Sequence, residues 1–192
     1  AYISTQNPMH GGHARAALEA GVHVLCEKPV TLDLDEALDL MRLAEDRGLV
    51  LAVNHHLPCA PAIRALARLV HEGAVGDLLG IVINHAVFLP ERLRTWRIQD
   101  LPGAGVVYDV TVHDAAVVDL LVRRAPSSAT AQAVRQGPWP KGAVDAVMSA
   151  LRWDDDLLCQ TYDAFTVPHN VTGITVHGTA GTAVATNAMT QD

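Results

Sequence analysis

A lysine held between an acid and a proline is the first feature of the sequence that indicates chemistry. Glu27, Lys28 and Pro29 directly follow an apolar run typical of a buried strand. A side chain at the carboxyl end of such a strand lies where parallel sheets bind ligands, and the proline fixes the backbone and can adopt a cis bond. Partial burial weakens an amine's preference for its charged form, which suits proton transfer. The alternative is an ordinary surface lysine in a loop.

An aspartate and a histidine form a second candidate pair. Asp109 and His113 are four residues apart in a stretch with helical spacing, so both lie on one face about one turn apart. Their neighbours are mostly valines, and a histidine among apolar side chains needs a polar partner. We therefore expect the carboxylate to orient the imidazole in a general acid–base pair. The alternative is a surface pair, which is common at this spacing.

Two more groups could contact a ligand. Trp96 and Arg97 place an aromatic ring beside a fork of donors, which can stack on and clamp a nucleotide or a sugar; the alternative is a core tryptophan beside a surface arginine. The polar loop at residues 5–10 follows an apolar stub and precedes a helix. Its backbone donors therefore lie at the ligand-binding rim of a parallel sheet, although ordinary turn chemistry would also explain it.

Neither a metal motif nor a phosphate loop is present in the sequence. It contains 10 histidines, but the pairs His10/His13 and His55/His56 do not match the spacing of zinc motifs. We therefore expect no metal. The sequence also contains no Gly-x-Gly-x-x-Gly, the loop that binds a dinucleotide pyrophosphate.

The composition excludes several function classes. The 192 residues carry 14 basic and 21 acidic side chains, a formal net charge of −7, and 49% are hydrophobic. This is the composition of a folded chain, and its acidic balance argues against nucleic acids and anionic membranes as partners. No apolar run is long enough to span a membrane. The three scattered cysteines, Cys26, Cys59 and Cys159, indicate a reducing compartment, which we take to be the cytoplasm.

The spacing of apolar residues predicts two architectures along the chain. Strands at 2–4, 22–26 and 49–53 alternate with helices at 11–20 and 34–47, which is typical of an α/β fold with a parallel sheet. A capping box of Asp33 and Glu36 begins the second helix. Beyond residue 55 the patterns predict an α+β domain with an open, mostly antiparallel sheet. Its expected helices are at 61–72 and 105–121, and its strands at 78–88, 129–135, 146–153, 157–165, 174–177 and 182–186.

Taken together, these motifs resemble the glucose–fructose oxidoreductase/inositol dehydrogenase (Gfo/Idh/MocA) family. The resemblance rests on four segments in this order: Ile3-Ser4-Thr5-x-Asn7-x-x-His10, Ala20-Gly21-x-His23-Val24-Leu25-Cys26-Glu27-Lys28-Pro29, Trp96-Arg97 and Asp109-x-x-x-His113. It runs over essentially the whole chain. Glu-Lys-Pro combined with Asp-x-x-x-His is far more specific than either motif alone. Further stretches, among them 54–57, 85–90 and 163–166, look most like the family members that reduce an anhydro-keto-sugar.

The resemblance implies the C-terminal part of a Rossmann domain at 1–54 and a substrate-binding and dimerisation domain at 55–192, whose sheet is covered by helices on one face. It implies hydride transfer at a sugar or polyol carbon, with NADP(H) favoured over NAD(H) as cofactor. It places catalytic roles on Lys28, Asp109 and His113. The cofactor contacts it implies fall on a larger set: Thr5, Gln6, Asn7, His10, Glu27, Lys28, Asn54, Trp96 and Arg97.

The chain departs from the family because the Gly-rich phosphate loop and the residues that select NAD or NADP would have to precede Ala1. We therefore expect an internal piece of a longer protein, with an incomplete C-terminal end. Three functions remain open: NADPH-dependent reduction of an anhydro-keto-sugar, NAD-dependent oxidation of an inositol or sugar, and a non-catalytic dimerisation or binding module. The strand alternation after residue 128 leaves a face that could form a homo-oligomer interface.

Overall fold

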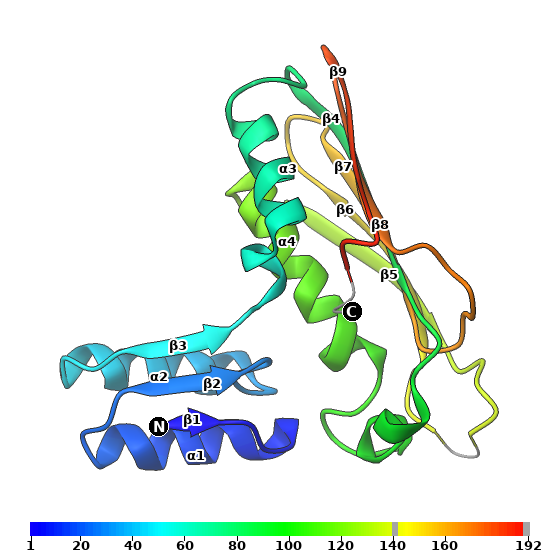
Figure 1. Cartoon of the computed structure of the whole chain (residues 1–192). Helices are drawn as coiled ribbons and strands as arrows, with labels where there is room; N and C mark the ends of the chain where they lie inside the picture. The colour runs from blue at the N-terminus through cyan, green and yellow to red at the C-terminus, as the bar shows by residue number, and fades with distance from the viewer. Residues whose placement is uncertain (140–141, 190–192) are drawn as a thin grey trace.

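Two sheets organise the structure, a computed structural model that describes residues 1–139 and 142–189 (Figure 1). The first sheet has three parallel strands in the order β1-β2-β3, and both crossover helices cover the same face. Its elements are β1 (Tyr2–Ile3), α1 (His10–Glu19), β2 (Val24–Glu27), α2 (Leu34–Asp46) and β3 (Leu51–Asn54). The predicted parallel α/β arrangement is therefore confirmed.

The core of this first part lies between the sheet and its helices. Ile3 and Cys26 on the strands meet Leu18 and Leu40 on the helices, and all four are buried. Burying an apolar side chain of this size contributes about 1.5–3 kcal/mol. The second helix begins as predicted, because the Asp33 carboxylate accepts a hydrogen bond from the backbone N–H of Glu36 at 2.9 Å.

The second sheet has six strands in the order β5-β6-β7-β4-β8-β9. The two central strands, β4 and β7, run parallel, and every other neighbouring pair is antiparallel. The strands are β4 (Leu78–Ala86), β5 (Ser128–Val134), β6 (Ala146–Arg152), β7 (Leu158–Ala164), β8 (Gly173–Gly178) and β9 (Gly181–Thr186). This confirms the open, mostly antiparallel sheet.

Helices α3 (Pro61–His71) and α4 (Val112–Val122) cover one face of this sheet (Figure 1). Their apolar side chains pack with those of the inner sheet face into the main core. The opposite face is open: every residue of β5 is exposed, and Met148 and Leu158 are more than half exposed. Among the described residues, no helix is both long enough and apolar enough to cross a membrane.

The helix predicted at 105–121 differs from the structure in kind. Its first part, Val107–Thr111, is a π-helical turn, and α4 begins only at Val112. Gly105 precedes the turn with a φ of 89°, and a Cβ there would lie 2.7 Å from the carbonyl oxygen of Val144. This close approach accepts only glycine. Such π turns are frequent at functional sites.

Candidate active site

Lys28 is held by an aspartate from the other part of the molecule. It follows the end of β2, and its Nζ donates to the backbone oxygen of Asp109 at 2.7 Å and to Asp109 Oδ1 at 2.9 Å. The other carboxylate oxygen, Oδ2, accepts from Arg97 Nε at 3.0 Å. The Lys28 and Asp109 side chains are only 12% and 13% exposed. Two cations from distant segments thus converge on one carboxylate.

His113 lies beside this ion-pair group but does not join it. Both carboxylate oxygens of Asp109 are taken by Lys28 and Arg97, and within the described residues the buried His113 Nδ1 has no hydrogen-bond partner. The predicted Asp109–His113 pairing is therefore wrong in its partner. The His113 ring instead packs against His56, with ring centroids 4.6 Å apart. Burial, and then the positive charge of Lys28, lower the pKa of His113 to about 2, so its imidazole is uncharged at neutral pH.

A cavity of about 580 Å³ connects these groups. Lys28, Arg97, Asp109 and His113 form part of its polar wall. The rest of the lining mixes polar and apolar side chains from the end of β4, from the segments that follow β3, β4 and β7, and from the π-helical turn; it includes His56, Leu57, His85, Phe88, Leu89, Leu93, Val110 and Phe165. A cavity that combines apolar walls with convergent polar groups is the usual form of a small-molecule site.

Glu27 and Asn54 lie together at the carboxyl ends of β2 and β3. Asn54 Nδ2 donates to Glu27 Oε1 at 2.8 Å, and the Tyr2 hydroxyl donates to the same oxygen at 2.6 Å. Burial alone would raise the pKa of Glu27, but these two hydrogen bonds, together with the charge of Lys28 and the nearby His56, outweigh it and the pKa is lowered. The carboxylate is therefore ionised at neutral pH and lies beside Lys28 in the chain.

The loop at residues 5–10 divides into exposed and buried positions. Thr5 and Gln6 are exposed, whereas Asn7 and His10 are buried. Asn7 Nδ2 donates to the carbonyl of Gly103 at 2.9 Å and so connects the two parts of the chain. The ring nitrogens of His10 lie 2.7 Å and 3.0 Å from the carbonyl oxygens of Pro29 and Thr5. His10 therefore ties its loop to the Lys28 loop instead of presenting its ring to a ligand.

Trp96 and Arg97 form the stacked pair that their types indicate. The Arg97 guanidinium carbon lies 4.8 Å from the centroid of the Trp96 ring, a cation–π contact. The same guanidinium is bonded to Asp109. The stacking orients Arg97, which is the member of the pair that lines the cavity.

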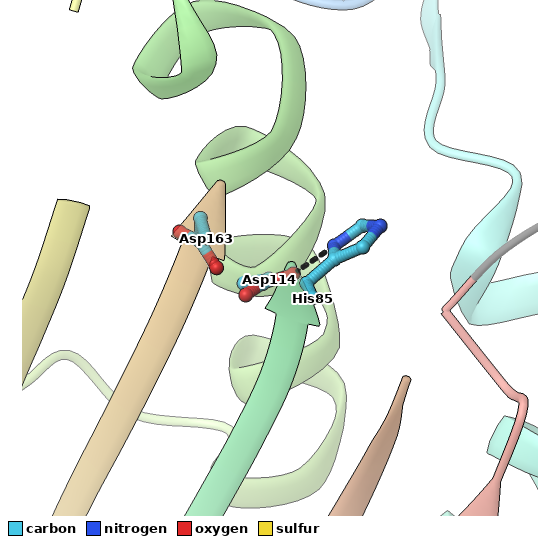
Figure 2. Close-up of side chains that lie close together, drawn as sticks. All are labelled: His85, Asp114 and Asp163. Carbon is cyan, nitrogen blue, oxygen red and sulfur yellow. Dashed lines mark hydrogen bonds and ion pairs between the residues drawn. The ribbon is translucent and has the colours of Figure 1, made fainter. Parts of the chain in front are cut away.

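A buried polar cluster near the cavity was not identified as a site from the sequence. Figure 2 shows His85 at the end of β4, Asp114 on α4 and Asp163 on β7. His85 Nδ1 lies 2.7 Å from Asp114 Oδ1, and the Thr111 hydroxyl donates to Asp163 Oδ2 at 2.6 Å. One signal could have indicated it: His85 is in phase with the buried Ile83 on its strand.

The exposed polar edge and the cavity together suit a redox cofactor and a small polar substrate. Thr5, Gln6 and Asn54 lie at the carboxyl ends of parallel strands, where dinucleotides bind in this type of sheet. The cavity beside them offers the Lys28 ammonium, and an uncharged imidazole at His113. A carbonyl oxygen placed there would meet hydrogen-bond donors of the kind that stabilise a developing negative charge.

Two family models match the chain in succession. Residues 1–55 match the oxidoreductase family with an NAD-binding Rossmann fold, and residues 63–184 match the GFO/IDH/MocA C-terminal domain.

Individual relatives agree with these matches. The chain is 39% identical over 191 residues to 1,5-anhydro-D-fructose reductase of Ensifer adhaerens, covering 99% of this chain and 57% of that protein. A solved levoglucosan dehydrogenase, in complex with NADH and levoglucosan, is similar with a TM-score of 0.84 and 26% identity, covering 96% of this chain and 53% of the other. Aldose-aldose oxidoreductase from Caulobacter crescentus, with a TM-score of 0.89, 20% identity and coverage of 100% and 57%, shares the fold. The chain thus spans less than two thirds of the length of these relatives.

Proposed function

The chain belongs to the GFO/IDH/MocA oxidoreductase family, and we propose that it carries the reaction site of an NAD(P)-dependent sugar oxidoreductase. The reaction would be the reduction of 1,5-anhydro-D-fructose or a similar keto-sugar with NADPH. When bound, the nicotinamide would supply or accept the hydride. The observation that carries this proposal is the position of Lys28, which Asp109 holds at the wall of a cavity beside the carboxyl edge of the parallel sheet.

In this proposal Lys28 polarises the substrate oxygen and supplies its proton. Asp109 accepts two of the hydrogen bonds that an ammonium can donate, which leaves the third N–H for the substrate. Arg97 shares the carboxylate and limits the movement of this group. Positioned proton transfer of this kind contributes about 10²–10⁴-fold to a rate.

His113 acts as an uncharged hydrogen-bonding group on the same oxygen or on a neighbouring hydroxyl. Its lowered pKa keeps the ring neutral, so it can donate one N–H but does not bring a second positive charge into the cavity. Lys28 then remains the source of positive charge next to the developing alkoxide.

The residues present fit a nicotinamide cofactor at the strand edge. Thr5 and Gln6 are exposed and free to contact it, whereas Asn7 and His10 shape the loop from within. The remaining proposed cofactor residues, Glu27, Asn54, Trp96 and Arg97, surround Lys28 on the same side. We favour NADP(H) over NAD(H).

A second candidate is a dehydrogenase of the same family that oxidises an inositol or another sugar with NAD. One of the similar structures contains NADH and levoglucosan, and the same lysine would then act as a base toward a substrate hydroxyl. Reduction and oxidation use the same groups in opposite directions, so a substrate panel separates them.

The open sheet face supports self-association as part of the proposal. It carries a hollow of about 550 Å³, and the exposed apolar side chains there include Leu79, Val82, Met148 and Leu158. Such patches mark interaction surfaces, and we propose that a second copy covers this one. The open sheet face belongs to the proposed domain at 55–192, which follows the proposed partial Rossmann domain at 1–54.

The three unpaired thiols fit a reducing compartment, the cytoplasm in our proposal.

The test combines cofactor binding with turnover on the full chain. Nicotinamide fluorescence would report binding of NADPH and NADH, and absorbance of the reduced nicotinamide would report turnover with keto-sugars, aldoses and polyols. We expect tighter binding of NADPH, turnover with a keto-sugar, and in Lys28→Met a loss of turnover far larger than any loss of cofactor affinity. A folded chain that binds neither cofactor and turns over no substrate would overturn the proposal and favour a non-catalytic binding module.

A further inference from the structure

The two buried carboxyl groups behind the cavity face each other without a donor between them. Asp114 and Asp163 are 1% and 0% exposed. One oxygen of each has a donor, from His85 to Asp114 and from Thr111 to Asp163. The remaining oxygens, Asp114 Oδ2 and Asp163 Oδ1, are buried, and neither has a hydrogen-bond partner among the described residues. Figure 2 shows the two carboxyls turned toward each other.

The fold brings this cluster together from three elements. His85 and Asp163 are directly opposite each other on the parallel strands β4 and β7, and Asp114 reaches them from α4. One donor or acceptor atom from each of the three lies within 4.8 Å of the others. Within residues 1–139 and 142–189, no lysine or arginine forms an ion pair with either carboxyl, and the Lys28 ammonium is bonded to Asp109.

Two ionised carboxylates in this position would be expensive. Each would lose its hydration, and the two charges would repel each other at short range. A single proton between the two orphan oxygens removes both costs, because it neutralises one charge and supplies the missing donor. The pKa values are raised as this requires: burial raises that of Asp114 to about 7, and burial together with the neighbouring Asp114 carboxyl raises that of Asp163 to about 8, so at least one of the two carboxyls holds a proton at neutral pH.

We propose that Asp114 and Asp163 share one proton, and that this singly charged pair is a positioning group that fixes His85 as the neutral, Nδ1-protonated imidazole. Asp114 Oδ1 remains an acceptor for the His85 Nδ1–H, which assigns the ring proton to Nδ1 and leaves Nε2, at the far edge of the ring in Figure 2, without one. A backbone hydrogen bond with Met189 acts in the opposite sense and raises the pKa of His85, but burial outweighs it. His85 lines the cavity, so the effect of its tautomer on catalysis rests on the proposed function. The shared proton itself does not depend on that function.

Other ionisable groups surround the pair on every side. They are His85 on β4, Cys159 on β7 and His113 on α4, with His56, Lys28 and Asp109 across the cavity. The histidines are held uncharged, because burial lowers the pKa of His85 to about 4 and that of His113 to about 2, and burial raises the pKa of the Cys159 thiol to about 12. The cation among them, the Lys28 ammonium, is paired with Asp109, and the ion pairs of the described residues include none with Asp163 and only the neutral His85 with Asp114.

The first test measures urea unfolding of the full chain against pH, for wild type and Asp163→Asn. The folded pair binds one proton more than the unfolded carboxyls, whose pKa is near 3.8, so it loses stability as pH rises toward 7–8. In Asp163→Asn the amide N–H replaces the proton. The folding equilibrium constant of the variant relative to wild type should therefore rise by up to about tenfold per pH unit between pH 5 and 7.

Parallel curves for wild type and variant would overturn the proposal, because a purely structural aspartate or a doubly ionised pair gives a difference that is constant with pH. Asp119→Asn, an exposed aspartate on the same helix, is the matched control and should leave the curve unchanged. A wild-type curve that changes after dialysis against EDTA would also overturn the proposal, in favour of a bound cation.

Two spectroscopic measurements remain decisive even if the variants do not fold or the protein proves inactive. In wild type, the carboxyl ¹³C shift of one of the two aspartates should stay at its protonated value at pH 6; ionised values for both would refute the shared proton. Long-range ¹H–¹⁵N spectra should show His85 as the Nδ1–H tautomer. In Asp114→Asn this preference should weaken and kcat/KM for the keto-sugar should fall about tenfold, whereas an unchanged tautomer would refute the positioning role.

Discussion

Asp109 and Asp114 are five residues apart on one helical stretch, yet their surroundings differ completely. Asp109 lies at the cavity wall, where Lys28 and Arg97 donate to its two oxygens. Asp114 faces the core, where it meets a neutral histidine and a second carboxyl. An aspartate thus balances two cations at position 109, whereas in our proposal the aspartate at position 114 shares a proton. Environment decides which chemistry a carboxyl group performs.

The charged wall of the cavity, Lys28, Asp109 and Arg97, thus differs from the buried groups behind it, where neutral histidines surround a carboxyl pair. The charged wall joins segments from both parts of the chain and, in our proposal, acts directly on a substrate. In the same proposal the groups behind it hold His85 neutral and in place. Changes in the charged wall should therefore affect the rate most, and changes behind it should affect pH dependence most.

Replacement of Lys28 should have the largest effect. Lys28→Met removes the proposed proton donor and should reduce kcat by about 10²-fold or more, measured with saturating cofactor and keto-sugar. Lys28→Arg is the matched variant: it keeps the charge beside Asp109 but does not release a proton at neutral pH. Recovery of full activity in Lys28→Arg would show that charge alone is needed and would contradict proton transfer.

Removing the charge of Asp109 should come next. Asp109→Asn leaves two partly buried cations without their counter-charge, which should lower the free energy of unfolding by about 1–3 kcal/mol. Asp100→Asn breaks an exposed pair with Arg135 and should cost less than about 1 kcal/mol. Chemical denaturation of both variants gives the comparison, and equal small losses would mean that the Lys28–Asp109–Arg97 group is not a structural link.

The effect of His113 should be smaller and should not depend on pH. His113→Asn removes one hydrogen bond to the reacting oxygen, a loss of about tenfold in kcat. Because the pKa of His113 is lowered to about 2, the ring stays neutral and the loss should be constant from pH 5 to pH 8. A loss that changes through the ordinary histidine range near 6.5 would show instead that His113 is charged during the reaction.

The same substitution should change acid stability in a defined direction. The folded chain excludes a proton that the unfolded His113 takes up below pH 6.5, so wild type loses stability as pH falls through that value. Without His113 this loss should be smaller. Thermal unfolding at pH 7 and pH 5 measures the difference. An equal loss of stability in both proteins would show that the His113 imidazole stays hydrated in the folded chain, with an ordinary pKa.

Substitutions on the open sheet face should have the smallest effect on turnover. Met148→Lys with Leu158→Glu adds charges to exposed apolar positions of β6 and β7 and should dissociate a dimer, as sedimentation velocity would show. Turnover per chain should change by less than about twofold, because neither residue lines the reaction cavity. A wild-type chain that sediments as a monomer would refute the proposed self-association.

Most of the fold could be predicted because its signals are local. Apolar periodicity placed α2 and β3 within a few residues, and Asp33 caps α2 as the predicted capping box requires. The Glu36 half of that box differs, because the Asp33 N–H donates to the Thr31 hydroxyl instead. The π turn at Val107–Thr111 could not be predicted in this way. It depends on the close approach of Gly105 to Val144, residues 39 positions apart in the chain.

The sequence indicated which residues belong to the candidate site but not which of them contact each other. Lys28, Asp109 and His113 were each identified, yet helical spacing paired Asp109 with His113 because that spacing reports only local neighbours. The true partner of Asp109, Lys28, is 81 residues away. The His85–Asp163 contact depends in the same way on the register of β4 against β7, which no local pattern contains. The catalytic and cofactor roles remain predictions.

The most direct test of the account is the transfer of deuterium from nicotinamide to substrate. The full chain, incubated with NADPH deuterated at both C4 positions and with 1,5-anhydro-D-fructose, should give a product with deuterium on the reduced carbon, detected by NMR and mass spectrometry. Lys28→Met, under the same conditions and with the cofactor still bound, should give about a hundredfold less. A product without deuterium, or equal transfer by wild type and Lys28→Met, would contradict a hydride-transfer site built around Lys28.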